Sequence, residues 1–195
     1  MRASGICCGF NYRFGAFAAG DVGMLKEESS KYGIKVWVHD PVYCHGKVVS
    51  STIIRRLIEE GNMETCTEFL GRPFTLNGKV EKGKHIGKKI GFPTANFPVN
   101  ENIVLPPNGV YFTYIIINGK KYNGVTNIGV KPTVGKNSKN VETNIFNFDG
   151  NLYGTEIEVS FLKMKRREKC FESIDALKNQ IYEDKKDAAK YHKNI

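Results

Sequence analysis

The sequence lacks several signatures that would point directly to a function. No Gly-Lys-Ser or Gly-Lys-Thr of a P-loop occurs. No apolar run reaches the roughly 18 residues that a membrane-spanning helix needs, and the first residues lack the apolar core of a signal peptide. The five cysteines contain no Cys-x-x-Cys pair, so neither a disulfide framework nor a zinc site is indicated. We therefore expect free thiols, no membrane partner and a cytoplasmic location.

The overall composition is that of a folded, basic protein. With 195 residues, of which 41% are hydrophobic, the chain can form one well-packed domain, or one domain and a fragment. The net charge of +9 favours anionic partners. Nucleic acid, acidic lipid and polyphosphate nucleotides all qualify, and charge alone does not separate them.

The first third of the chain has the pattern of an α/β unit. Short apolar runs at residues 5–10 and 34–39 flank a predicted helix at 24–32, and a second helix is predicted to begin at residues 50–51. Two strands and two helices leave a parallel sheet short of neighbours. We therefore expect this unit, residues 1–66, to be incomplete.

From residue 69 onward the pattern changes to short β segments separated by turn dipeptides. Residues 110–117 and 154–162 are predicted strands, and a final helix should begin near Ser173. Several short strands at this spacing indicate a small antiparallel barrel. The strongest hairpin signals are Asn77-Gly78, Asn118-Gly119 and Asp149-Gly150.

A glycine- and lysine-rich segment, residues 83–96, has the composition of a phosphate-binding loop. Its glycines allow backbone N–H groups to approach an anion closely, and its lysines add positive charge. Thr94 and Asn96 offer two oxygens suited to a hydrated magnesium ion. The segment therefore predicts the binding of ATP with Mg²⁺. Its candidate phosphate-binding residues are Gly83, Lys84, Gly87, Lys88 and Gly91.

One carboxylate stands out as a candidate general base. Glu142 lies between apolar neighbours in the predicted strand 141–145. Phosphoryl transfer needs a base that orients the accepting hydroxyl, and a glutamate at this position could take that proton. The pattern alone favours a solvent-facing glutamate on an edge strand, because most glutamates are exposed.

Taken together, these motifs resemble the riboflavin kinase module over about residues 69–187. The resemblance implies an α+β fold, with a small antiparallel Greek-key β-barrel and a C-terminal helix over residues 67–195. It also implies that Mg²⁺ and ATP serve in the phosphorylation of riboflavin to FMN. The motifs that carry it are Gly71-Arg72-Pro73, Gly91-Phe92-Pro93-Thr94-Ala95-Asn96, Gly109-Val110-Tyr111, Asn127-Ile128-Gly129, Val141-Glu142-Thr143, Leu152-Tyr153-Gly154 and Arg166-x-Glu168-x-x-Phe171.

The resemblance also implies roles for single residues. Thr94 and Asn96 would hold the metal and the nucleotide phosphates, beneath a glycine-rich flap at 83–91. Glu142 would be the general base for the terminal ribityl hydroxyl, and Tyr153 would lie beside the nucleotide. The residues of the loop that closes on the flavin would be Arg166, Glu168 and Phe171.

The front of the chain resembles the bacterial FAD synthetase module. The motif Gly9-Phe10-Asn11-Tyr12-Arg13-Phe14-Gly15 and the segment Ser50-Ser51-Thr52-x-x-Arg55 carry this resemblance, which implies a partial nucleotidyltransferase-like unit over residues 1–66. The family's His-x-Gly-His does not occur in the sequence. We therefore expect no adenylyl transfer from this chain and interpret its remaining site as vestigial. Two explanations stay open: the chain is the C-terminal portion of a longer enzyme, or its first strands were lost. The residues of that site are Asn11, Ser51, Thr52 and Arg55.

Two other functions compete with the riboflavin kinase hypothesis. The first is a bifunctional enzyme that also adenylylates FMN to FAD. The second is a non-catalytic basic barrel that binds nucleic acid through aromatic platforms. The motif at 91–96 is better explained by ATP, so we expect riboflavin, FMN and Mg-ATP as partners and no nucleic acid. The sequence does not give the oligomeric state.

Overall fold

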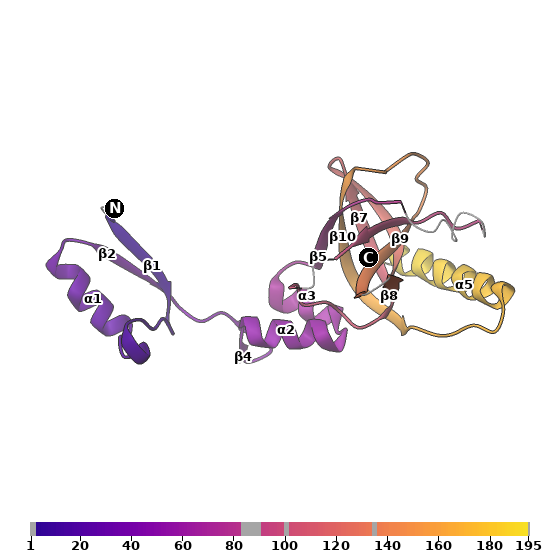
Figure 1. The fold of residues 1–195 in the computed structure, drawn as a ribbon. Coiled ribbons are helices and arrows are strands. Elements are labelled where there is room, and N and C mark those ends of the chain that lie inside the picture. Colours follow the sequence, from indigo (N-terminus) through magenta and orange to yellow (C-terminus); the bar gives the residue numbers. More distant parts are fainter. Residues whose placement is uncertain (1–2, 83–90, 100–101, 134–135, 195) are drawn as a thin grey trace. The chain divides into compact units, whose positions relative to one another are not determined.

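The computed structural model describes residues 3–82, 91–99, 102–133 and 136–194. The chain divides into two compact units, Met1–Ser50 and Ser51–Ile195. Figure 1 colours both units along the sequence.

The first unit is a small parallel βαβ arrangement. Strand β1 (Gly5–Gly9) pairs in parallel with β2 (Lys35–His39), and helix α1 (Val22–Lys31) connects them. Asp21 caps this helix, because its Oδ1 accepts a hydrogen bond of 3.0 Å from the N–H of Met24. In the described part of the chain no third strand joins this sheet, which agrees with the expectation of a short sheet. A 3-10 turn (Ala16–Ala18) precedes α1, and a hairpin of β3 (Tyr43–Cys44) and β4 (Lys47–Val48) follows β2.

Two short helices begin the second unit. Helix α2 (Ser51–Glu60) ends at Gly61, which has a φ of 77°. Helix α3 (Met63–Leu70) follows at once, and Asn62 caps it through the N–H of Thr65. Glu64 of α3 forms an ion pair with Lys163 of the barrel. Helix α2 packs on α3, and α3 packs on the barrel.

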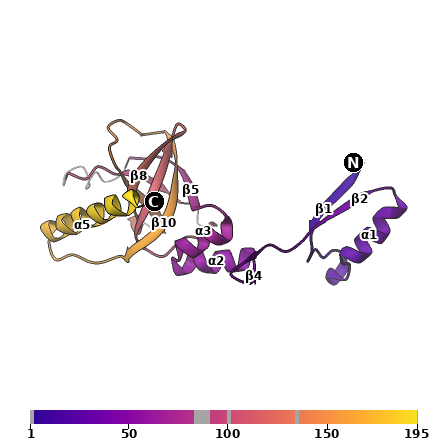
Figure 2. The same cartoon turned by 180° about the vertical axis from the view of Figure 1, so that it is seen from behind.

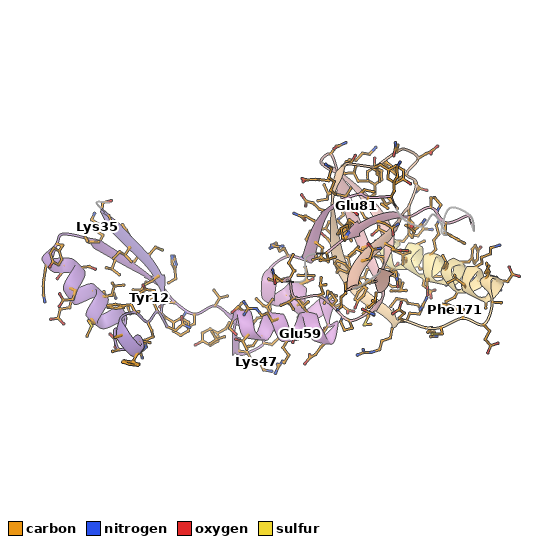
Figure 3. The ribbon with its side chains drawn as sticks, viewed as in Figure 1. Tyr12, Lys35, Lys47, Glu59, Glu81 and Phe171 are labelled. Atoms are coloured by element: carbon orange, nitrogen blue, oxygen red, sulfur yellow. The ribbon has the colours of Figure 1, made fainter. Side chains whose placement is uncertain are left out.

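The rest of the second unit is a six-stranded antiparallel barrel, with sheet order β5-β10-β7-β8-β9-β6 (Figure 1). Strands β7, β8 and β9 form a meander, and β10 returns to lie beside β7, which is the Greek-key arrangement. The barrel closes where the N–H of Glu81, labelled in Figure 3, donates a 2.8 Å hydrogen bond to the carbonyl oxygen of Asn96. The strands are β5 (Phe74–Lys79), β6 (Ala95–Pro98), β7 (Gly109–Ile117), β8 (Lys120–Thr133), β9 (Lys136–Ile145) and β10 (Glu156–Arg167).

The three predicted hairpin signals correspond to three different local structures. Asn118-Gly119 forms the turn between β7 and β8, and both residues have positive φ values, 50° and 78°. Asp149-Gly150 lies in the longer connection between β9 and β10. The prediction of a hairpin at Asn77-Gly78 is wrong, because both residues lie inside β5. Gly78 is needed there for packing, since a Cβ would overlap the ring of Phe97.

The barrel interior is filled mainly by apolar side chains. A line of three buried hydroxyls also crosses the interior, from Thr113 to Thr126 to Thr143, with oxygen–oxygen distances of 2.8 Å. The fully buried side chains include Tyr111, Phe97, Phe161, Ile115, Ile128 and Val141. The barrel interior is therefore densely packed.

The C-terminal helix covers part of the outer face of the barrel. Helix α5 (Ile174–Lys193) begins where predicted, with Ser173 as its cap. Its Ala188 packs with Phe112 of β7 and Val125 of β8 in one buried cluster. Figure 2 shows the helix beside the barrel from the opposite direction. The space between helix and sheet is where the candidate site lies.

Candidate active site

The strand register aligns the main candidate residues in one row across the barrel. Arg166 of β10 pairs with Val110 of β7, and Val110 pairs with Asn127 of β8. Asn127 in turn pairs with Glu142 of β9, which pairs with Asn96 of β6. Cross-strand partners present their side chains on the same face of a sheet. Residues from five strands, far apart in the sequence, therefore meet on one outer face of the barrel.

A cavity of about 300 Å³ lies between this face, helix α5 and the connection that precedes the helix. Phe171, labelled in Figure 3, lies in that connection. The apolar lining is Phe92, Val110, Val125, Phe171, Leu177 and Ile181. The polar lining is Thr94, Thr126, Asn127, Glu142, Asn144, Arg166, Glu168, Lys169 and Asp184. A flat apolar group and a hydroxylated chain can both find matching surfaces here.

Glu142 is held by an amide network inside the wall. Its strand pairs with β8 on one side and β6 on the other, and the residue is half-buried, so it is not a solvent-facing residue on an edge strand. The Nδ2 of Asn140 donates to Glu142 Oε1 at 3.3 Å and to Asn96 Oδ1 at 3.1 Å. Asn140 therefore ties the candidate base to a candidate metal ligand.

Thr94 lines the cavity, and Asn96 lies beside it. The Nδ2 of Asn96 donates to Thr94 Oγ1 at 3.0 Å, and Asn96 itself is buried. A hydroxyl oxygen and an amide oxygen can each accept a second partner, so Thr94 Oγ1 and Asn96 Oδ1 keep capacity for a ligand. Within the described ranges no three His, Cys, Asp or Glu side chains gather as a metal site. Hydroxyl and amide oxygens of this kind fit Mg²⁺, which prefers hard oxygen ligands and keeps several waters.

Arg166 forms a buried ion pair with helix α5. Its Nη2 lies 2.7 Å from Asp184 Oδ2, and its Nε lies 3.1 Å from both carboxylate oxygens. The side chains are only 13% and 3% exposed. Gln180 donates a further hydrogen bond of 3.0 Å to Asp184, and the Arg166 guanidinium lies 5.8 Å from the ring centre of Phe171. The pair fixes the helix and the cavity wall against each other.

Glu168 closes the cavity on the side of β8. Its Oε2 accepts a hydrogen bond of 3.2 Å from Asn108 Nδ2. Its Oε1 approaches Gly129 so closely that a Cβ there would lie 3.1 Å away. A larger residue at 129 would push the carboxylate aside, so the glycine permits this position.

Tyr153 borders a second cavity of about 550 Å³, which shares Thr94 with the first. Its N–H donates to Asn151 Oδ1 at 3.0 Å, and its side chain is largely exposed. The two cavities therefore adjoin at Thr94. Of the predicted glycine-rich flap, Gly91 is exposed with a φ of 86°. Gly83, Lys84, Gly87 and Lys88 lie outside the described residues.

The residues of the second predicted site are divided between the two units. Asn11 follows β1 in the first unit. Ser51, Thr52 and Arg55 are exposed in the first turns of α2, in the second unit.

The residues that were not predicted from the sequence include Asp184 and Asn144, which line the cavity, and Asn140, which bonds to Glu142. Asp184 carries a detectable signal, because it interrupts the apolar stripe that Leu177, Ile181 and Ala188 form along one face of α5. Asn140 and Asn144 share the face of β9 with Glu142 by simple alternation, but only the strand pairing shows what they contact.

Two family models match the chain. The model described as riboflavin kinase matches residues 70–192, and the model described as FAD synthetase matches residues 1–53.

Several relatives are described as bifunctional riboflavin kinase/FMN adenylyltransferase. The protein from Buchnera aphidicola subsp. Schizaphis graminum is 40% identical over 95% of this chain and 61% of its own length. That from Bacillus subtilis is 34% identical over 96% of this chain and 60% of its own length. The chain thus spans about three fifths of the curated relatives that it matches.

A solved structure is also similar. It is described as a macrolide-efflux protein from Streptococcus pneumoniae, with 32% identity and a TM-score of 0.80 over 90% of this chain and 57% of that one. In the described part of the present chain, no helix has the length and apolar character to cross a membrane.

Proposed function

The chain belongs to the riboflavin kinase family, and we propose that it transfers the γ-phosphoryl group of ATP to the terminal ribityl hydroxyl of riboflavin, giving FMN. One observation carries this proposal above the others. Glu142 lies in register with Asn96 on one side and, through Asn127, with the wall that leads to Arg166. The proposed base would thus share one face with the proposed metal ligand Asn96 and with the wall of the apolar slot.

Glu142 is the proposed general base. Its carboxylate accepts the proton of the terminal hydroxyl while the hydroxyl oxygen bonds to the γ-phosphorus. The bond from that phosphorus to the β–γ bridging oxygen breaks, and ADP leaves. Because Asn140 donates to Glu142 Oε1, the carboxylate is oriented before the substrate arrives.

Thr94 and Asn96 would hold Mg²⁺, which would neutralise charge on the ATP phosphates. The pair fits such a role because hydrogen bonds already hold both oxygens in place. Asn96 donates to Thr94 Oγ1, and Asn140 donates to Asn96 Oδ1. The lysines and glycines of the segment 83–91 would bind the phosphates, and Tyr153 would lie beside the nucleotide in the adjoining cavity.

The apolar lining would receive the flavin ring. Phe92 and Phe171 offer ring faces, and Leu177 and Ile181 form the helix side of the slot. Arg166, Glu168 and Phe171 would close on the flavin, with Arg166 anchored by Asp184. Closure would exclude water and so protect ATP from hydrolysis.

The domain division that we propose follows these roles. Residues 67–195 would form the kinase domain, and residues 1–66 would belong to the FAD synthetase module. Asn11, Ser51, Thr52 and Arg55 would be what the chain retains of an adenylyltransferase site. Because the chain contains no His-x-Gly-His, we propose that it makes FMN and not FAD.

We also propose a cytoplasmic location, where ATP is available and the five free thiols stay reduced. Its partners would be riboflavin, FMN and Mg-ATP. The net positive charge would then favour binding of the nucleotide phosphates, and nucleic acid would not be a partner.

The test is direct. Purified protein is incubated with riboflavin, ATP and Mg²⁺, and flavins are separated by chromatography. We expect FMN and ADP in equal amounts, and no FAD above a control without enzyme when FMN is supplied. Absence of FMN under these conditions would reject the kinase proposal, and formation of FAD would reject the limit to one activity. Salt-sensitive oligonucleotide binding without FMN formation would favour the nucleic-acid alternative.

A further inference from the structure

One buried polar atom in the cavity wall has no partner within the described protein. The side chain of Asn144 is 6% exposed, and its Nδ2 donates a hydrogen bond of 2.7 Å to the carbonyl oxygen of Pro93. Its Oδ1 accepts no hydrogen bond from any residue that the structure describes, and Asn144 lines the cavity. Buried acceptors in native proteins almost always have a partner, so this oxygen indicates a ligand.

The position of Asn144 defines which part of a ligand it can meet. It lies two residues beyond Glu142 on the same face of β9, about 7 Å away along the strand. It pairs with Val125 of β8, whose side chain belongs to the apolar cluster under α5. Asn144 therefore lies between the proposed base and the apolar slot.

The chemistry of Asn144 Oδ1 limits which groups of a ligand can bind it. An amide oxygen accepts hydrogen bonds and donates none, so its ligand must present an O–H or N–H. The phosphate oxygens of ATP are acceptors and do not suit it. The ribityl chain of riboflavin carries secondary hydroxyls between the ring and the terminal hydroxyl. Five bonds of about 1.5 Å place the furthest of them roughly 6 Å from the terminal oxygen, which matches the spacing along the strand.

We propose that Asn144 is a substrate-recognising residue, whose Oδ1 accepts a hydrogen bond from a secondary hydroxyl of the ribityl chain. This inference rests on the proposed function and adds a determinant of specificity to it. With Glu142 at the terminal hydroxyl, the side chain of Asn144 would favour a polyhydroxylated chain over a plain alkyl alcohol on the same ring. Failure to satisfy such a buried acceptor is a strong basis for rejecting an analogue.

The experiment compares two substrates and three variants. The substrates are riboflavin and a flavin whose side chain is a 5-hydroxypentyl group, which keeps the terminal hydroxyl and lacks the secondary ones. Asn144→Leu removes the acceptor at similar volume, and Asn144→Asp keeps an acceptor oxygen. Asn77→Leu on β5, an exposed position outside the cavity lining, is the matched control.

We expect Asn144→Leu to lower kcat/KM for riboflavin by roughly tenfold more than for the hydroxypentyl flavin, mainly through KM, because the lost bond to Pro93 affects both substrates and the lost acceptor affects only riboflavin. The KM for ATP should not change. Asn144→Asp should keep the preference for riboflavin even if it is less stable, because the lost bond to Pro93 affects both substrates equally. Asn77→Leu should match the wild type on both.

Three results would overturn the inference. The first is an equal loss of kcat/KM on both substrates in Asn144→Leu. The second is that this variant needs more Mg-ATP while its KM for riboflavin is not raised. The third is that Asn144→Asp no longer prefers riboflavin to the hydroxypentyl flavin. If the wild type phosphorylates neither flavin, the proposed function itself fails. If the wild type makes FMN and Asn144→Leu has the same kinetic constants as the wild type, only the role of Asn144 is overturned.

Discussion

Replacing Asp184 with Asn should destabilise the second unit and weaken riboflavin binding together. The substitution keeps the shape of the side chain and removes its charge, so Arg166 loses its partner in a site where the two side chains are 13% and 3% exposed. Removing one member of a buried, hydrogen-bonded ion pair costs about 3–5 kcal/mol, and the isosteric amide should place the loss near the lower end. For a unit of this size, about 3 kcal/mol corresponds to a fall in Tm of roughly 6–12 °C.

The same helix provides a matched control. Asp187 pairs with Lys165 at 2.6 Å, but both side chains are about one third exposed. Because solvent screens that pair, Asp187→Asn should leave the Tm within the error of measurement. The two variants differ by three positions on one helix and carry the same chemical change, so they compare a buried, multiply bonded carboxylate with a partly exposed one.

A double variant separates stability from ligand contact. Arg166→Met combined with Asp184→Leu replaces the buried pair with apolar side chains of similar volume, which should recover most of the lost stability. If Arg166 also contacts the flavin, the KM for riboflavin should stay raised in the double variant. Thermal unfolding by circular dichroism and steady-state FMN formation are the assays. An Asp184→Asn variant as stable as the wild type would refute the buried pair, and full kinetic recovery in the double variant would remove Arg166 from flavin binding.

Three further predictions follow from the site and the helix. Asn96→Ala should raise the Mg²⁺ concentration needed for half-maximal FMN formation several-fold, and an unchanged requirement would count against the metal role. Asn140→Leu should lower kcat more than KM, because the hydrogen bond that orients the Glu142 carboxylate is lost; an unchanged kcat would contradict that orientation role. Burial lowers the pKa of His192 below its ordinary 6.5, and its neighbour Lys121 acts in the same direction. His192 is thus neutral in the folded state at pH 7, and its stabilising contribution is lost as the pH falls from 6.5 through the lower folded pKa. His192→Gln should therefore lose less Tm than the wild type between pH 7 and about pH 5, and parallel losses would contradict this assignment.

The local turn chemistry of the barrel is only partly readable from sequence. Asn118-Gly119 forms its turn because both residues tolerate positive φ, and no described residue lies within 4 Å of where a Cβ of Gly119 would be. Gly78 carries the same local signal in Asn77-Gly78 but lies inside β5, where the Phe97 ring from β6 takes the place of a side chain. The second outcome depends on packing between strands that are distant in the sequence, and no local pattern contains that information.

The site, too, can be predicted only as far as local sequence patterns reach. Alternation places Asn140, Glu142 and Asn144 on one face of β9, and this much can be predicted. Whether that face meets solvent or a covered cavity depends on the partners of β9 and on the docking of α5, which are set by the register of the whole barrel. For that reason only the folded structure shows that Asp184 pairs with Arg166.

The most direct test of the central claim is the rate of FMN formation by Glu142→Gln. The variant keeps the side-chain shape and the neighbouring Asn140, and it loses the proton acceptor. A positioned general base contributes roughly 10²–10⁴-fold, so kcat should fall by about that factor while the KM values for riboflavin and ATP change little. FMN formation within a few-fold of the wild-type rate would contradict the account.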